Sequence, residues 1–255
     1  MNLEKAKEEF LKFVRNYDEK NSRINLKMEH SLRVMNISKK IAENLGLTKE
    51  KIELATLIGL LHDIGRFEQV KRYNTFSDFM SIDHGNLGVE ILQKDNYIRK
   101  YIEEDKYDEI ILKAIKNHNK YAIEKGLNEE EVLFSKIIRD ADKLDIFYES
   151  VTLFWQEEEK LEKVENSIVT KEVLDQFNRK ILVDRQKRLS DVDHVVGMIS
   201  FIFDINFKYS FQTLQKEDYV EKMIRRFKFK SKETQDTIET INKLVDEYIK
   251  ERLRD

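Results

Sequence analysis

The chain contains no cysteine and no proline, and it has only seven glycines among 255 residues. The absence of cysteine excludes disulfides, thiolate metal sites and cysteine nucleophiles. The absence of proline and the scarcity of glycine leave few residues that break helices, while Glu, Lys, Leu and Ile are abundant. This composition predicts an almost entirely helical protein and does not fit a turn-rich β architecture.

The chain also lacks a long hydrophobic run and an excess of charge of either sign. It contains no stretch of about 18 apolar residues that could span a membrane. Charges occupy residues 1–10, where a signal peptide would be apolar, so we expect a cytoplasmic protein without a membrane partner. Charged residues make up 37% of the chain, but the net charge is only −3, and a nucleic-acid partner is therefore not expected. The oligomeric state is left open, a homo-oligomer included.

The length and the 40% content of hydrophobic residues are sufficient for a substantial core. We expect an all-α fold with a helical core and an N-terminal helical arm over residues 1–150. Residues 151–255 are expected to form a helical extension packed on that core. No Gly- or Pro-rich linker separates the two ranges, and the aromatic segment 201–211 needs to be covered.

Four of the five histidines lie in the first half of the chain. They are His30 in a helix predicted over 26–45, His62 after the apolar segment 52–61, His84 in a helix beginning near Ser81, and His118 in a helix beginning near Asp108. Each continues the apolar face of its helix, so each is predicted to point inward. One such histidine is more often a hydrogen-bonded core residue than a ligand, but four are not well explained independently.

Aspartates accompany these histidines in apolar surroundings. Asp63 follows His62 directly, and three more carboxylates lie in the apolar helix predicted over 132–147. Burying Asp63 would cost several kcal/mol unless a cation compensates its charge. Imidazole and carboxylate ligands without thiolates suit Mn, Fe, Co, Ni or Zn better than Ca or Mg. The predicted metal ligands are His30, His62, Asp63, His84, His118 and Asp142, which is enough for two ions bridged by Asp63.

Three segments, in this order, resemble helix signatures of the HD-domain metal-dependent phosphohydrolase superfamily, which is named for its His-Asp doublet. They are His30-Ser31-Leu32-Arg33-Val34, Leu60-Leu61-His62-Asp63-Ile64-Gly65 and Asp140-Ala141-Asp142-Lys143-Leu144-Asp145. The resemblance covers about residues 20 to 150 and implies an all-α HD-domain core. The Gly-Tyr-Pro signature of the cyclic-dinucleotide branch is missing, which argues against that substrate.

The resemblance also implies roles for individual residues. His30, His62, Asp63 and Asp142 match the core metal ligands, with Asp142 preferred to Asp140. His84 and His118 match the additional histidines of the branches that hold two metals. We therefore expect a hydrolase that cleaves a phosphate ester or anhydride of a nucleotide or another small phosphorylated metabolite through a metal-activated hydroxide. Its cofactor would be a divalent transition metal, with two ions per chain.

The catalytic candidates are Asp63, Arg66 and Lys143, the last two as cations that neutralise phosphate. Arg33 is a further candidate, but an ion pair with a nearby carboxylate is equally compatible with Arg33 and Arg66, and Lys143 could simply be exposed. Asp83 or Asp140 could orient ligands. The aromatic connection over 66–82 could form a lid or rim of the site.

Two other functions fit the same residues. One is a regulatory module that binds an effector and uses its metal structurally, without turnover. The other is a di-iron oxygenase, since one HD-related branch has a similar mixed-ligand site. Turnover of a phosphate ester separates the hydrolase from the first, and oxygen-dependent chemistry of the iron form would reveal the second.

Overall fold

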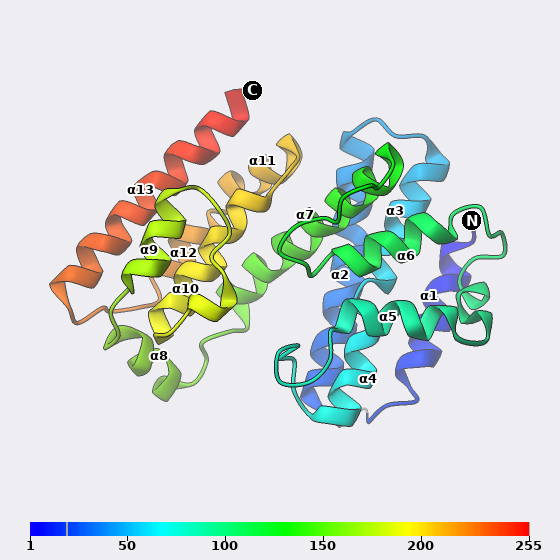
Figure 1. Cartoon of the computed structure of the whole chain (residues 1–255), viewed down its shortest axis with the longest axis horizontal. Coiled ribbons are helices and arrows are strands. Elements are labelled where there is room, and N and C mark those ends of the chain that lie inside the picture. The colour runs from blue at the N-terminus through cyan, green and yellow to red at the C-terminus, as the bar shows by residue number, and fades with distance from the viewer. Residues whose placement is uncertain (19, 255) are drawn as a thin grey trace. The chain divides into compact units, whose positions relative to one another are not determined.

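The computed structural model describes residues 1–18 and 20–254 (Figure 1). Within these residues every regular element is a helix and no strand occurs, which confirms the all-α prediction. The chain divides into two compact units, Met1–Asp145 and Ile146–Asp255. The predicted packing of residues 151–255 on the first part stays a prediction.

The first unit contains the helices that carry the predicted site. They are α1 (Leu3–Val14), α2 (Ser22–Asn44), α3 (Lys49–Leu61), α4 (Ile64–Tyr73), α5 (His84–Gln93), the 3-10 helix η1 (Lys94–Lys100), α6 (Asp108–Asn117) and α7 (Glu129–Thr152). The division between the units falls inside α7, after Asp145.

Helices α2 and α3 form a closely packed pair. Gly46, with φ +65°, follows α2 in the left-handed conformation, and the Thr48 hydroxyl caps the first turn of α3. A side chain at Gly59 would place its Cβ 2.6 Å from Ser38 Oγ, so the glycine permits the two helices to approach. Because the helices lie so close, α3 is buried from Leu54 to Leu61.

The chain turns sharply between α3 and α4. Asp63 occupies the turn with φ −101° and ψ 17°, a sparsely populated backbone region that is common in functional sites. Helix α4 follows at once and buries Ile64, Phe67 and Val70, which recur every three residues. The connection predicted over 66–82 therefore consists of most of α4 followed by a loop over 74–83.

The connection between α6 and α7 is fixed from within the unit. Asn128 caps α7, because its Oδ1 accepts a hydrogen bond from the Glu131 N–H at 2.9 Å. The Arg139 side chain on α7 is 1% exposed and donates hydrogen bonds to the carbonyls of Asn117 at 2.8 Å and Lys120 at 2.6 Å. The backbone on both sides of His118 is thereby held against α7.

The second unit is also helical. After the end of α7 it contains α8 (Glu158–Glu165), α9 (Lys171–Asn178), η2 (Arg185–Lys187), α10 (Asp191–Ile199), η3 (Ser200–Asp204), α11 (Lys208–Glu217), α12 (Tyr219–Ile224) and α13 (Lys232–Arg254). Among the described residues, no helix is both long enough and apolar enough to cross a membrane.

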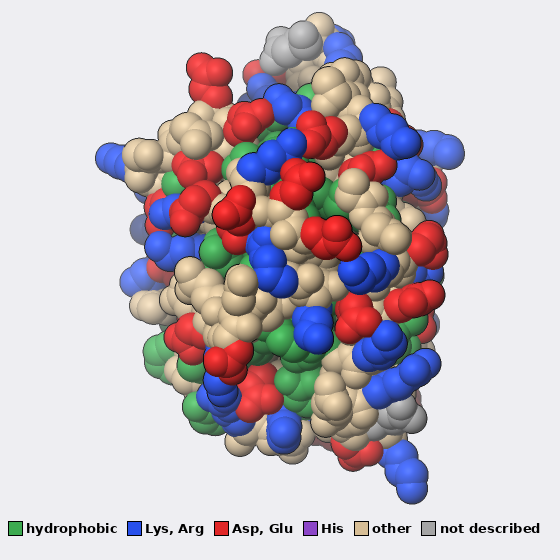
Figure 2. Space-filling view, turned by 90° about the vertical axis from the view of Figure 1, so that its right-hand side faces the viewer, with side chains coloured by type: hydrophobic (Ala, Val, Ile, Leu, Met, Phe, Trp, Pro, Cys, Tyr) green, Lys and Arg blue, Asp and Glu red, His purple; other side chains and the backbone are tan. Residues whose placement is uncertain are grey.

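The charged side chains are mixed by sign on the surface that Figure 2 presents. Lys and Arg alternate there with Asp and Glu, and neither sign gathers into a continuous field. This mixture agrees with the small net charge of −3.

Candidate metal centre

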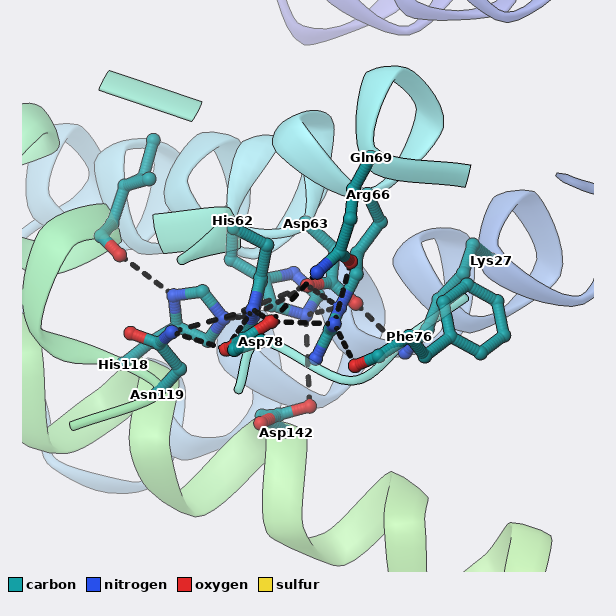
Figure 3. A network of polar contacts seen from close by, with 12 residues as sticks. Lys27, His62, Asp63, Arg66, Gln69, Phe76, Asp78, His118, Asn119 and Asp142 are labelled. Carbon is teal, nitrogen blue, oxygen red and sulfur yellow. Dashed lines mark hydrogen bonds and ion pairs between the residues drawn. The ribbon is translucent and has the colours of Figure 1, made fainter. Parts of the chain in front are cut away.

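The six predicted ligand side chains come together in the first unit. His30 projects from α2, His62 and Asp63 from the α3–α4 junction, His84 from the start of α5, His118 from the end of α6 and Asp142 from α7. The four histidines are at most 2% exposed. Figure 3 shows Asp63 and His62 at the centre of the polar network, with Asp142 reaching toward them from α7.

The histidines form two pairs whose Nε2 atoms face each other. His30 Nε2 lies 3.2 Å from His62 Nε2, and His84 Nε2 lies 2.9 Å from His118 Nε2. Asp142 Oδ1 stands beside the first pair, 3.0 Å from His30 Nε2 and 3.6 Å from His62 Nε2.

Asp63 lies between the two pairs and offers one oxygen to each. Its Oδ2 is 3.5 Å from His30 Nε2 and 3.6 Å from His62 Nε2. Its Oδ1 is 3.3 Å from His84 Nε2 and 3.5 Å from His118 Nε2. A carboxylate placed in this way can bridge two cations, one at each histidine pair.

The other ring nitrogen of every histidine has an oxygen partner. Nδ1 of His62 lies 2.9 Å from the Gly59 carbonyl, and Nδ1 of His118 lies 2.6 Å from the Ile115 carbonyl. Both carbonyls belong to the last turn of a helix, where no backbone N–H reaches them. Carboxylates hold the remaining two rings, because Asp145 lies 2.6 Å from His30 Nδ1 and Asp78 lies 2.7 Å from His84 Nδ1.

These partners determine which ring nitrogen of each histidine carries the proton. When each Nδ1 donates its proton backward, each Nε2 carries a lone pair directed into the cluster. Two facing lone pairs 2.9 or 3.2 Å apart repel each other unless a cation lies near both. The donor set of imidazoles and carboxylates therefore fits divalent transition metals.

Electrostatics reinforce this preference for a cation. Burial opposes ionisation of Asp63, but Lys27 and the neighbouring histidines hold its pKa well below its usual range. Burial also opposes ionisation of Asp142, yet its histidine partners likewise keep its pKa well below normal. Burial lowers the pKa of His118 to about 4. Burial and the charge of Lys27 both lower the pKa of His30. The neighbouring aspartates outweigh them and raise this pKa to about 9.

Two residues behind the histidines were missed in the sequence. Asp145 accepts two hydrogen bonds from Arg33, Nε at 2.7 Å and Nη2 at 2.9 Å, so Arg33 makes the ion pair that was one of its two readings. Asp145 could have been found three positions after Asp142, on the same helix face. Asp78 lies in the loop after α4, where no periodicity marks it.

Two cations lie beside Asp63. Lys27, which was not among the predicted site residues, places Nζ 2.8 Å from Asp63 Oδ2. Its position three residues before His30, on the same helix face, could have indicated this role. The two N–H groups of Arg66 Nη1 are shared among three oxygens, those of Gln69 at 2.7 Å, the Phe76 carbonyl at 2.6 Å and Asp78 at 3.0 Å. Its Nε lies 3.6 Å from Asp63 Oδ1 and has no hydrogen-bond partner among the described residues.

The three remaining candidates are Asp83, Asp140 and Lys143. Asp83 caps α5, because its Oδ1 accepts from the Asn86 N–H at 2.8 Å, and it also pairs with Lys120. Asp140 and Lys143 are buried on α7, so the alternative that Lys143 is simply exposed is wrong. A catalytic role for Lys143 stays a prediction.

An all-α unit with a buried His and Asp cluster of this composition defines a helical protein with a candidate transition-metal centre. Comparison with protein families narrows that class, because residues 28–146 match the family model described as HD domain. This match agrees with the resemblance of residues 28–146 to the HD-domain metal-dependent phosphohydrolases. No curated protein and no solved structure matched the chain.

Proposed function

We propose that this protein is a metal-dependent phosphohydrolase that cleaves a phosphate ester or anhydride of a nucleotide or another small phosphorylated metabolite. The observation that carries the proposal is the pair of facing histidine couples with Asp63 between them. The HD domain supports the reaction class. The cations beside the cluster, Lys27 and Arg66, support a phosphorylated substrate.

Six residues would hold the metal. His30, His62, Asp142 and one oxygen of Asp63 surround one position, and His84, His118 and the other oxygen of Asp63 surround a second. A bound divalent ion would polarise the phosphoryl oxygens and lower the pKa of the attacking water.

The chain itself supplies charge and orientation. Arg66 is anchored through Nη1, which leaves Nε and Nη2 as the edge of the guanidinium without hydrogen bonds to the described residues. Such a free edge suits two oxygens of one phosphate. Lys27 adds a second positive charge 2.8 Å from Asp63, and Lys143 remains a candidate for a third.

The test combines metal analysis with hydrolysis. Protein purified without chelator is expected to contain about two transition-metal ions per chain. It is also expected to hydrolyse members of a panel of phosphate monoesters, phosphate diesters and phosphate anhydrides. Asp63→Asn removes the bridging charge and is expected to lower both metal content and hydrolysis, the latter by at least about 100-fold. The exposed Asp105→Asn is the matched control and is expected to change neither.

Other outcomes point elsewhere. Bound metal without turnover of any ester would contradict the proposal and favour the regulatory module. Oxygen-dependent chemistry of the iron form, again without phosphate release, would favour the oxygenase.

A further inference from the structure

The loop over 74–83 is hydrogen-bonded to the candidate metal centre, although none of the six candidate ligands belongs to it. Its Asp78 carboxylate accepts hydrogen bonds from Arg66 at 3.0 Å, Gln69 at 2.9 Å and Asn119 at 3.1 Å, besides its contact with His84. Figure 3 shows Asp78 in the middle of this network, between residues of α4 and the end of α6. The loop is therefore anchored from both sides.

The loop also has internal hydrogen bonds. The Ser81 hydroxyl donates to the Ser77 carbonyl at 2.7 Å, and the Met80 N–H donates to the same carbonyl at 3.2 Å. These bonds close a turn around residues 77–81. Side chains at the tip of this turn thus have a defined position relative to Asp78.

The exposed fractions of the side chains show which part of the cluster reaches solvent. The side chains of the four histidines and Asp63 are at most 3% exposed. Lys27 is 13% exposed, Asp142 is 15% exposed and Asp78 is 18% exposed. These three side chains are therefore where the cluster borders solvent, and a substrate would meet them first.

Apolar side chains of the loop lie at that border. The Phe76 ring centroid is 5.5 Å from Lys27 Nζ and 5.6 Å from Arg66 Cζ, and Figure 3 shows the ring beside Lys27. Phe79 is 88% exposed and Met80 is 77% exposed. Phe79 directly follows Asp78, so their Cα atoms are about 3.8 Å apart. Isolated exposed apolar residues need no explanation, but two neighbours at the rim of a polar centre suggest a ligand.

We propose that Phe76, Phe79 and Met80 form a platform that binds the organic part of the substrate and selects phosphate esters carrying a planar aromatic group, such as a nucleoside base. This inference rests on the proposed function, which puts the phosphate at Lys27 and Arg66. An ester held there by its phosphate would extend its organic part outward, past these partly exposed side chains. Aromatic and thioether side chains stack on planar rings and gain nothing from a small polar alcohol.

The experiment measures binding rather than turnover. Dissociation constants of metal-loaded protein for adenosine monophosphate, phenyl phosphate, glycerol phosphate and inorganic phosphate are determined by calorimetry. The wild type is expected to bind the two aromatic esters at least about tenfold more tightly than the other two ligands. The double variant Phe79→Ser, Met80→Ser is expected to lose most of this preference.

The matched control is Leu45→Ser. Leu45 is also an exposed apolar residue, at 37%, but it lies fifteen positions after His30, about 22 Å along α2. Its ligand preference should equal that of the wild type. Metal content is measured for each variant, so that a lost metal is not mistaken for a lost platform.

Equal affinity of the wild type for aromatic and polar esters, or an unchanged preference in the double variant, would overturn the platform while leaving phosphate binding intact. Failure of the proposed function has another signature, since hydrolysis of every ester would then be absent although binding could persist. The remaining outcome is that neither inorganic phosphate nor any ester binds. That outcome would overturn both proposals.

Discussion

Every histidine of the cluster presents Nε2 inward because its Nδ1 is held from behind. Helix carbonyls hold His62 and His118, and carboxylates hold His30 and His84. The two kinds of partner differ in effect, since a carboxylate makes the imidazole more electron-rich than a carbonyl does. The carboxylates should therefore contribute to metal affinity as well as to ring orientation.

The change Asp145→Asn tests this contribution. It keeps the size of the side chain and one oxygen, but it removes the negative charge behind His30 and weakens the bidentate pair with Arg33. Metal affinity, measured by competition with a chelator, is expected to fall about 10- to 100-fold. Asp105→Asn, at an exposed position, should leave affinity unchanged. Equal affinities of the two variants would mean that Asp145 only fills space.

At the scale of elements, the α3–α4 junction and the start of α5 are interdependent. A Cβ at Gly65 would lie 2.2 Å from the His84 carbonyl oxygen and 2.7 Å from the Gly88 nitrogen. Both are backbone atoms, which cannot rotate away. Gly65 therefore sets the separation of α4 and α5, and with it the separation of Asp63 and His84.

The change Gly65→Ala should force α4 and α5 apart. We expect it to reduce the free energy of unfolding by about 2 kcal/mol or more and to lower metal occupancy. Gly88→Ala is the comparison, because its Cβ would meet side-chain methyl groups of Ile64 and Ile115 at 3.3 Å. Urea unfolding should show the larger loss for Gly65→Ala, and the reverse order would contradict this account of the packing.

The helical elements and the ligand-bearing faces could be predicted because they depend on local signals. Gly46, Thr48 and Asn128 mark helix ends through their own backbone or side-chain chemistry. Periodicity placed each histidine on an inward face. Asp78 could not be predicted in this way, since its role depends on a loop folding back onto residues up to 41 positions away.

In the second unit, one buried carboxylate organises several chain segments. Asp193 on α10 is fully buried and accepts hydrogen bonds from the N–H groups of Leu189 and Ser190, each at 3.0 Å. It also accepts from the N–H of Thr170 at 2.9 Å and from its hydroxyl at 3.0 Å. The neighbouring His194 is exposed and shares no cluster among the described residues.

The change Asp193→Ala would leave these buried donors without an acceptor. Each unsatisfied donor costs about 1–3 kcal/mol, so we expect a loss of about 3 kcal/mol or more in the free energy of unfolding. Asp191→Ala, at an exposed position of the same helix, is the control. Thermal unfolding followed by circular dichroism measures both variants, and similar melting temperatures would show that Asp193 is not required.

At the scale of the whole molecule, bound metal should stabilise the first unit more than the second. The candidate ligands all lie within residues 30–142, in the first unit. On the face that Figure 2 shows, positive and negative side chains are mixed. A ligand that binds only the folded state stabilises it in proportion to the logarithm of its concentration over its dissociation constant. For this chain, that stabilisation should be concentrated where the histidines lie.

Removal of metal with a chelator should therefore expose the backbone of the first unit selectively. Without cations, the facing Nε2 atoms of His84 and His118, 2.9 Å apart, must accept a proton between them or separate. Hydrogen–deuterium exchange is expected to rise in peptides from α3, α5 and the end of α6 after chelation and to return to its initial rate when a divalent transition metal is added back. Peptides from α10 and α13 serve as the internal reference and should exchange at unchanged rates. Uniform loss of protection in both units would show instead that the metal controls the folding of the entire chain, and no change anywhere would contradict a metal at this cluster.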